Sequence, residues 1–184
     1  MLCAIFGGTG VRLKDAAWAC LLVCAASAHA EDGYDLWLRY RPIEAPWAMR
    51  YRNFATEVVA APGANMAAQE LQRGVAGLLA VTPTMDHRIT RDGAIVLRTP
   101  GSSADFGAPL ADLKTLGREG YLIRSIKIDG HRATLIAANS NIGLLYGAFG
   151  FLRLMQTRRR LDALSVREAP RIPQIGRASC RERV

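Results

Sequence analysis

Paired carboxylates have the chemistry for acid and base catalysis, and five of the 16 acidic side chains of this chain are considered as candidates. Hydrolysis of a glycosidic bond, for example, requires two carboxyl groups that flank the scissile bond. The candidates stand in predicted loops or at strand ends: Glu57, Asp86, Asp105, Asp112 and Glu119. Nothing in their neighbourhood would raise a carboxyl pKa or bring two of them together. We therefore predict no catalytic residue in this chain.

Neither of the two histidines beyond residue 30 has a recognisable catalytic partner. His131 directly follows a predicted hairpin turn and is expected to be exposed, while His87 stands beside Asp86 in a loop-like stretch. A serine or cysteine nucleophile in a suitable setting is missing for both. Phosphate-binding loops, H-E-x-x-H and calcium-loop motifs are also missing from the sequence. The sequence predicts no cofactor-binding and no metal-binding residue.

A group of aromatic residues near the N-terminus could form a platform for stacking sugar rings. Its members are Tyr34, Trp37, Tyr40, Trp47 and Tyr51. Packing in the core or at an interface is the favoured interpretation. Similarly, the arginines at 158–160 are expected to be a solvated cap at a helix C-terminus, where cations suit the helix dipole.

The first 30 residues have the order of a secretory signal peptide. Arg12 and Lys14 precede an apolar run at 16–26, and Ala28-His29-Ala30 supplies small residues for cleavage. The run is too short for a permanent membrane helix. We expect cleavage after Ala30 and a periplasmic or extracellular protein without a stable membrane anchor.

Other interpretations of this end are weaker. A lipoprotein signal before Cys24 would have a small residue where Val23 stands. Phe6 to Gly10 look like the start of a dinucleotide-binding loop, but the apolar run follows in place of a βαβ unit. A start codon at Val11, which would leave a compact signal peptide, is the plainer explanation of these first residues.

The last residues, 175–184, resemble the translation of a widely used short-read sequencing adapter, codon by codon. We expect them to be an artefact joined to a truncated gene. Residues 31–174 then form one mature N-terminal α/β accessory domain. The composition supports one ordinary core, because half of the 184 residues are hydrophobic.

Cysteine and charge exclude several classes of protein. All four cysteines fall in the leader or the tail, so the mature domain has no disulfide, zinc–thiolate site or cysteine nucleophile. The formal net charge is +8, of which the leader contributes one charge and the tail two, leaving about +5. The arginines of the mature domain are scattered along the chain, which argues against nucleic-acid binding.

Periodicity predicts a two-layer α/β (α+β) sandwich in which two main helices cover a mixed, mostly antiparallel sheet. The predicted strands are 34–43, 56–60, 94–98, 121–128 and 131–138. Asp129-Gly130 joins the last two as a hairpin turn, since both residues tolerate a left-handed backbone. The long stretch 99–120 is expected to be a surface loop with one helical turn near Leu113.

The two predicted helices differ in how much of their surface is apolar. The first, near 65–80 with Asn65 as its cap, has a single apolar stripe. The second begins near Asn139-Ser140-Asn141 and ends near Thr157. It carries two apolar stripes: Ile142, Leu145, Phe149 and Leu152, and Leu144, Ala148, Phe151 and Met155. A helix that is apolar on two sides must be covered on two sides, so we expect the sheet on one side and a domain absent from this chain on the other.

Several segments resemble glycoside hydrolase family 67, the α-glucuronidases. They are the opening at 31–40 (EDGYDLWLRY), the helix start at 138–147 (ANSNIGLLYG) with 151–156 (FLRLMQ), and the end at 168–173 (EAPRIP). The resemblance spans essentially all of 31–173 and is least over 99–120.

The resemblance implies an N-terminal domain related to those of hexosaminidase-like glycosidases, followed by a (β/α)8 catalytic barrel. It implies release of (4-O-methyl)glucuronic acid from xylo-oligosaccharides (aldouronic acids) in xylan breakdown, with inversion and without a metal. None of the family's catalytic positions falls on this chain. Two alternatives are a secreted carbohydrate-binding module and the N-terminal domain of another glycosidase, such as a hexosaminidase.

Overall fold

The computed structural model describes residues 40–100 and 112–170. The predicted signal peptide, Asp105, and the adapter-like tail lie outside these residues. The described elements, in chain order, are α3 (Ala45–Arg52), β1 (Glu57–Ala60), α4 (Asn65–Leu79), β2 (Thr84–Asp86), β3 (Ala94–Arg98), the 3-10 turn η1 (Asp112–Thr115), β4 (Tyr121–Ile128), β5 (His131–Ala138), α6 (Asn141–Gln156) and β6 (Ser165–Glu168).

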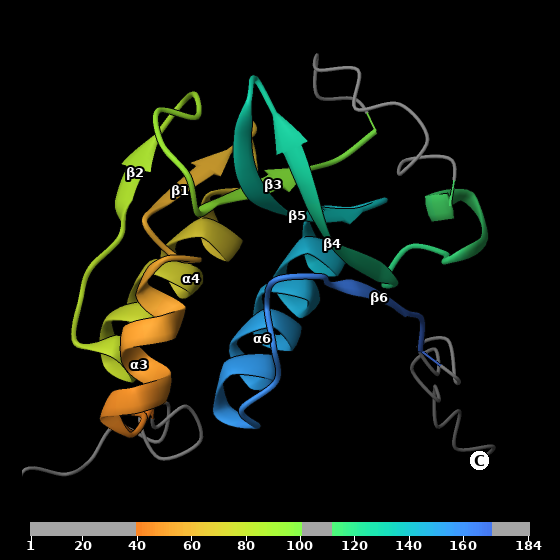
Figure 1. Ribbon diagram of the computed structural model, residues 1–184. Coiled ribbons are helices and arrows are strands. Elements are labelled where there is room, and N and C mark those ends of the chain that lie inside the picture. Colours follow the sequence, from red (N-terminus) through yellow and green to blue (C-terminus); the bar gives the residue numbers. More distant parts are fainter. Residues whose placement is uncertain (1–39, 101–111, 171–184) are drawn as a thin grey trace, which may run out of the picture. The chain divides into compact units, whose positions relative to one another are not determined.

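The strands form one mixed sheet in the order β2-β1-β3-β5-β4-β6. β2, β1, β3 and β5 pair in parallel with one another, whereas β4 is antiparallel to both β5 and β6. Helices lie together on one side of the sheet, as Figure 1 shows. The predicted two-layer α/β fold with a mixed sheet is therefore confirmed. Three of the five strand pairings are parallel and two are antiparallel, so the parallel part is larger than in the mostly antiparallel sheet that was expected.

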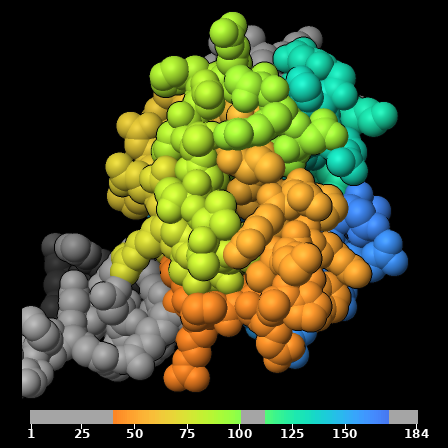
Figure 2. All heavy atoms as spheres, turned by 60° about the vertical axis from the view of Figure 1, so that its left-hand side comes forward, coloured from red at the N-terminus to blue at the C-terminus, as the bar shows by residue number. Residues whose placement is uncertain are grey.

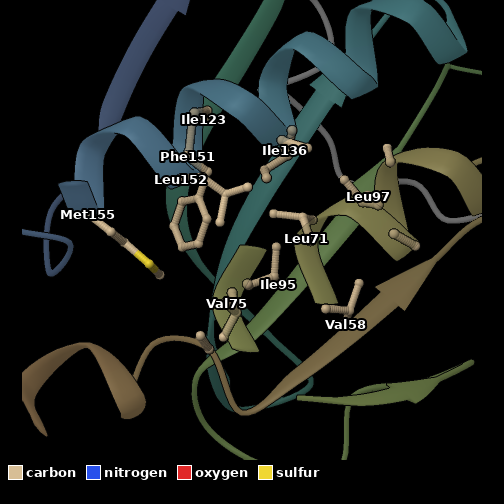
Figure 3. Close-up of a cluster of buried hydrophobic side chains, with 14 of the residues drawn as sticks. Val58, Leu71, Val75, Ile95, Leu97, Ile123, Ile136, Phe151, Leu152 and Met155 are labelled. Carbon is tan, nitrogen blue, oxygen red and sulfur yellow. The ribbon is translucent and has the colours of Figure 1, made fainter. Parts of the chain in front are cut away.

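Two clusters of buried side chains pack on the two faces of the sheet. On the helix side, α4 and α6 point Leu71, Val75, Phe151 and Met155 toward strand residues such as Ile95 (Figure 3). On the other face, Leu113 and Leu116 cover the strands. The helical turn predicted near Leu113 is confirmed as η1.

The β4–β5 hairpin matches its prediction residue for residue. Asp129 and Gly130 have φ angles of 51° and 84°, the left-handed conformations that a two-residue hairpin turn requires. The β3 prediction is confirmed as well.

The caps of the two long helices differ from each other. The Ser140 hydroxyl accepts a hydrogen bond from the Gly143 amide at 3.2 Å, which confirms the predicted start of α6. The helix predicted near 65–80 is confirmed as α4, but its predicted cap is wrong, because Asn65 is the first helical residue and Ala64 occupies the cap without a side-chain bond.

Three elements were not predicted from the sequence. Helix α3 has no apolar stripe and buries only Ala48 and Tyr51. Strands β2 and β6 are short edge strands with mostly exposed side chains. The strand predicted at 34–43 is wrong for residues 40–43, which form no strand; this segment packs on α4, where Ile43 donates its amide hydrogen to the Leu78 carbonyl at 2.9 Å.

Candidate interdomain surface

The side of α6 that faces the sheet is closely packed. Leu144, Ala148, Phe151 and Met155, the stripe predicted to lie there, are fully buried. Gly143 and Gly147 let the helix approach the strands, since a Cβ at Gly147 would lie 2.5 Å from Ile136 Cγ2. One side of the predicted two-sided helix is thereby confirmed.

The other stripe of α6 remains partly open. Ile142 and Tyr146 are each 42% exposed, while Leu145 and Phe149 are half-buried. Leu152 departs from this pattern and is buried, because Gly74 of α4 leaves room for its methyl groups. Without a second covering layer, α6 therefore presents apolar side chains outward.

Helix α4 lies next to α6. Gly63, just before α4, lies beside Asn141, and Gly74 of α4 lies beside Leu152, so the two helices run side by side in the same direction. Met66, near the start of α4, is 69% exposed. We call Met66, Ile142, Leu145, Tyr146 and Phe149 the apolar helix surface.

A groove borders this surface between α6 and strands β4 and β6. It has a volume of about 680 Å³, and Tyr146 and Phe149 belong to both the groove and the apolar helix surface. Tyr121 of β4 crosses its floor and donates a hydrogen bond to Glu168 of β6. A Cβ at Gly150 would lie 2.5 Å from the Tyr121 hydroxyl, so α6 needs a glycine there.

Tyr121 makes the stability of the domain sensitive to alkaline pH. Burial, followed by the hydrogen bond to Glu168, raises the pKa of the Tyr121 hydroxyl above its ordinary value of 10.0. The folded state therefore holds this proton more tightly than the unfolded state. The resulting stabilisation is fully present below about pH 10 and is lost as the pH rises toward the folded-state pKa.

Tyr121→Phe is accordingly expected to have a melting temperature that falls less steeply between about pH 9 and pH 11 than that of the unmodified chain. At neutral pH it should be less stable by about 1 kcal/mol, because one buried hydrogen bond is lost. Tyr146→Phe, which removes an exposed hydroxyl, is the control. Identical pH slopes for the Tyr121→Phe and unmodified chains would contradict this assignment.

The carboxylates considered for catalysis are tied to separate neighbours. Glu57 is fully buried and accepts hydrogen bonds from Thr90 and Arg91. Asp86 accepts the His87 amide hydrogen at 2.9 Å. Two more members of this set are described: Asp112 pairs with Arg124, and Glu119 lies in the loop before β4. None of these bonds brings two of the carboxylates together.

The histidines also lie apart. His131 is 38% exposed, less than expected, with its Nδ1 3.4 Å from Asp92 Oδ1. Arg132 donates both its amide hydrogen and a guanidinium hydrogen to Asp92, and these bonds lower the pKa of that carboxyl. His87 is exposed.

The aromatic platform is not formed by the described residues, and the favoured packing interpretation is confirmed for them. Tyr51 is fully buried and donates its hydroxyl hydrogen to the Arg159 carbonyl at 2.8 Å. Trp47 packs 5.6 Å from the Tyr51 ring, with Arg50 over its ring at 5.1 Å. Tyr40 packs on α4, and Tyr34 and Trp37 lie outside the described residues.

Two of the arginines at 158–160, which were expected to be a solvated cap, form ion pairs. Arg158 has a left-handed φ of 56° and pairs with Glu44 at 2.7 Å, while Arg160 pairs with Asp162. The Arg158–Glu44 pair attaches the turn after α6 to the start of α3, which lies at the surface (orange in Figure 2). This pair was not predicted, because its two residues lie 114 positions apart in the chain.

Within residues 40–100 and 112–170, the His, Cys, Asp and Glu side chains form no group of three that could hold a metal ion. The helices within these ranges are too short or too polar to cross a membrane.

Residues 36–151 match the protein family described as glycosyl hydrolase family 67 N-terminus. The chain is similar to alpha-glucuronidase A of Emericella nidulans, with 31% identity over 141 residues that make up 71% of this chain. It spans only 16% of the length of that relative. A solved structure of a family GH115 4-O-methyl-alpha-glucuronidase with specificity for decorated arabinogalactans matches 61% of this chain and 17% of its own, with a TM-score of 0.40 and 17% identity.

Proposed function

Because the chain belongs to the glycosyl hydrolase family 67 N-terminal family, we propose that it is the non-catalytic N-terminal domain of a larger, secreted α-glucuronidase. The parent would release (4-O-methyl)glucuronic acid from xylo-oligosaccharides. The similarity to a small part of an alpha-glucuronidase supports this proposal. Family membership also favours it over the N-terminal domain of a hexosaminidase.

The observation that carries the interdomain role is the apolar helix surface. Ile142 and Tyr146 are exposed on α6 together with the half-buried Leu145 and Phe149, and Met66 is exposed on the adjacent helix α4. Exposed groups of apolar side chains are typical of interfaces. We infer that a (β/α)8 catalytic domain of the same protein covers them. A free-standing carbohydrate-binding module would not need a second apolar side on α6.

The proposal is tested by comparing the parent protein with this chain alone. We expect the parent to release glucuronic acid from aldouronic acids and the 184-residue chain to release none. Release by the chain alone would contradict the non-catalytic role. A parent that is inactive on aldouronic acids but cleaves another glycoside would contradict the substrate.

The surface itself is tested by Ile142→Gln with Tyr146→Gln. In the isolated chain, this pair should reduce self-association and binding of a hydrophobic dye. In the parent, it should instead lower stability by about 1 to 3 kcal/mol, because two side chains buried at an interface become polar. Met85→Gln, at a 44% exposed position on β2, is the control and should have neither effect. A loss of stability in the parent distinguishes an interface from a merely exposed patch, and a parent of unchanged stability would contradict the interface.

We also propose export through the segment 1–30. N-terminal sequencing of the exported protein should begin at Glu31. An exported protein that retains Met1 or Val11 would contradict cleavage at this site.

A further inference from the structure

A second hollow surface lies away from the apolar helix surface, where α3, the β4–β5 hairpin and the turn after α6 meet. Two neighbouring hollows of about 280 and 320 Å³ share Phe54, Leu161 and Asp162 in their walls. We call the two hollows together the basic groove. Its floor is apolar, with Phe54 and Leu161.

Four cations line the basic groove: Arg50, Lys127, Arg132 and Arg160. Arg160 already binds Asp162, and Arg132 already binds Asp92. Within residues 40–100 and 112–170, Arg50 and Lys127 have no carboxylate partner in an ion pair. The groove therefore retains two positive charges that an anionic ligand would neutralise.

The walls of the groove are held in place by bonds between distant segments. The Ser125 hydroxyl donates to the Leu161 carbonyl at 3.2 Å and accepts from the Leu164 amide at 2.8 Å. The Tyr51 hydroxyl bonds the Arg159 carbonyl on the α3 side. The segments that carry the cations are thus fixed before a ligand binds, which lowers the entropy cost of binding.

We propose that the basic groove binds an acidic oligosaccharide, with a uronate carboxylate between Arg50 and Lys127 and a sugar ring over Phe54 and Leu161. An apolar floor with a few charged groups at its edge is a typical arrangement for a small ligand. Phe54 is the one aromatic residue among the described lining, whereas binding of single-stranded nucleic acid uses successive aromatic rings. The choice of a uronic acid rests on the proposed function.

The test is a calorimetric or NMR titration of the 184-residue chain. The probes are xylotriose carrying one glucuronic acid, unsubstituted xylotriose, and a single-stranded DNA oligonucleotide. The acidic sugar should bind at least about tenfold more tightly than neutral xylotriose. Arg50→Gln with Lys127→Gln should remove about that factor.

Arg88→Gln with Lys114→Gln is the matched control, because it removes two exposed charges elsewhere. Equal affinity for the two sugars, an equal loss in the control pair, or preferential binding of DNA would each overturn the proposal. Binding is measured here rather than hydrolysis. If the parent is active but Arg50→Gln with Lys127→Gln binds the acidic sugar as tightly as the unmodified chain, the groove proposal alone is overturned. If the chain binds the acidic sugar specifically but the parent releases no glucuronic acid, the proposed function alone is overturned.

Discussion

Glu57→Ala is expected to lower the free energy of unfolding by about 3 kcal/mol, which is a large part of the stability of a domain of this size. Glu57 is 0% exposed, and its carboxylate accepts hydrogen bonds from the Thr90 amide at 2.8 Å, the Thr90 hydroxyl at 2.7 Å and the Arg91 amide at 3.3 Å. Alanine would leave these donors without their acceptor and would release the loop before β3. Urea unfolding measures the loss.

Two variants separate the role of this carboxylate from a general effect of charge. Glu57→Gln keeps the shape and part of the acceptor capacity, so its loss should be smaller, about 1 kcal/mol. Glu44→Ala removes a carboxylate whose ion pair with Arg158 is exposed, and it should lose less than about 1 kcal/mol. A Glu57→Ala variant as stable as Glu44→Ala would show that the buried bonds contribute little.

Gly93→Ala is expected to destabilise the domain by more than about 3 kcal/mol. Gly93 has a φ of 87°, and a Cβ at this position would lie 2.2 Å from the Asn53 carbonyl oxygen. Backbone atoms cannot give way as a flexible side chain does. The displaced glycine would also weaken the bonds from its amide to the Arg132 carbonyl and from the Thr56 amide to its own carbonyl.

Gly130→Ala is the matched control for this substitution. Gly130 has nearly the same φ, 84°, but no atom lies within 4 Å of a Cβ placed there. Gly130→Ala should therefore lower the free energy of unfolding only by the penalty for an alanine in the left-handed conformation, about 1 kcal/mol. The difference between the two melting curves measures the close approach at Gly93, and equal losses would contradict it.

The parts of the fold that could be predicted depend on local signals. The β4–β5 hairpin and α6 were predicted closely because Asp129-Gly130 and Ser140 act on residues beside them. Parallel pairing of β1, β3 and β5 joins segments far apart in the chain. The pattern of hydrophobic residues within one segment does not indicate which distant segment it will pair with. Helix α3 was missed for the same reason, since contacts with α4 and the turn after α6 stabilise it rather than an apolar stripe.

The candidate surface was predicted in part. The two apolar stripes of α6 were recognised, but periodicity alone did not show that Gly74 would let α4 cover Leu152. Met66 was not identified as part of the surface, because its exposure depends on how the helices pack. Glu57 had a usable signal, since it directly precedes Val58 and Val59 of a buried strand and so required a partner.

The order of the strands has a consequence for the folding pathway. The hairpin and α6 are consecutive in the chain and form by closing short loops, whereas β1 must find β3, and β3 must find β5, across long intervening segments. Loop closure is slower for these distant pairs, so the hairpin with α6 is the expected nucleus and β1 joins late. Glu57 and Gly93 attach that late part, and for this reason their substitutions should accelerate unfolding far more than they slow folding.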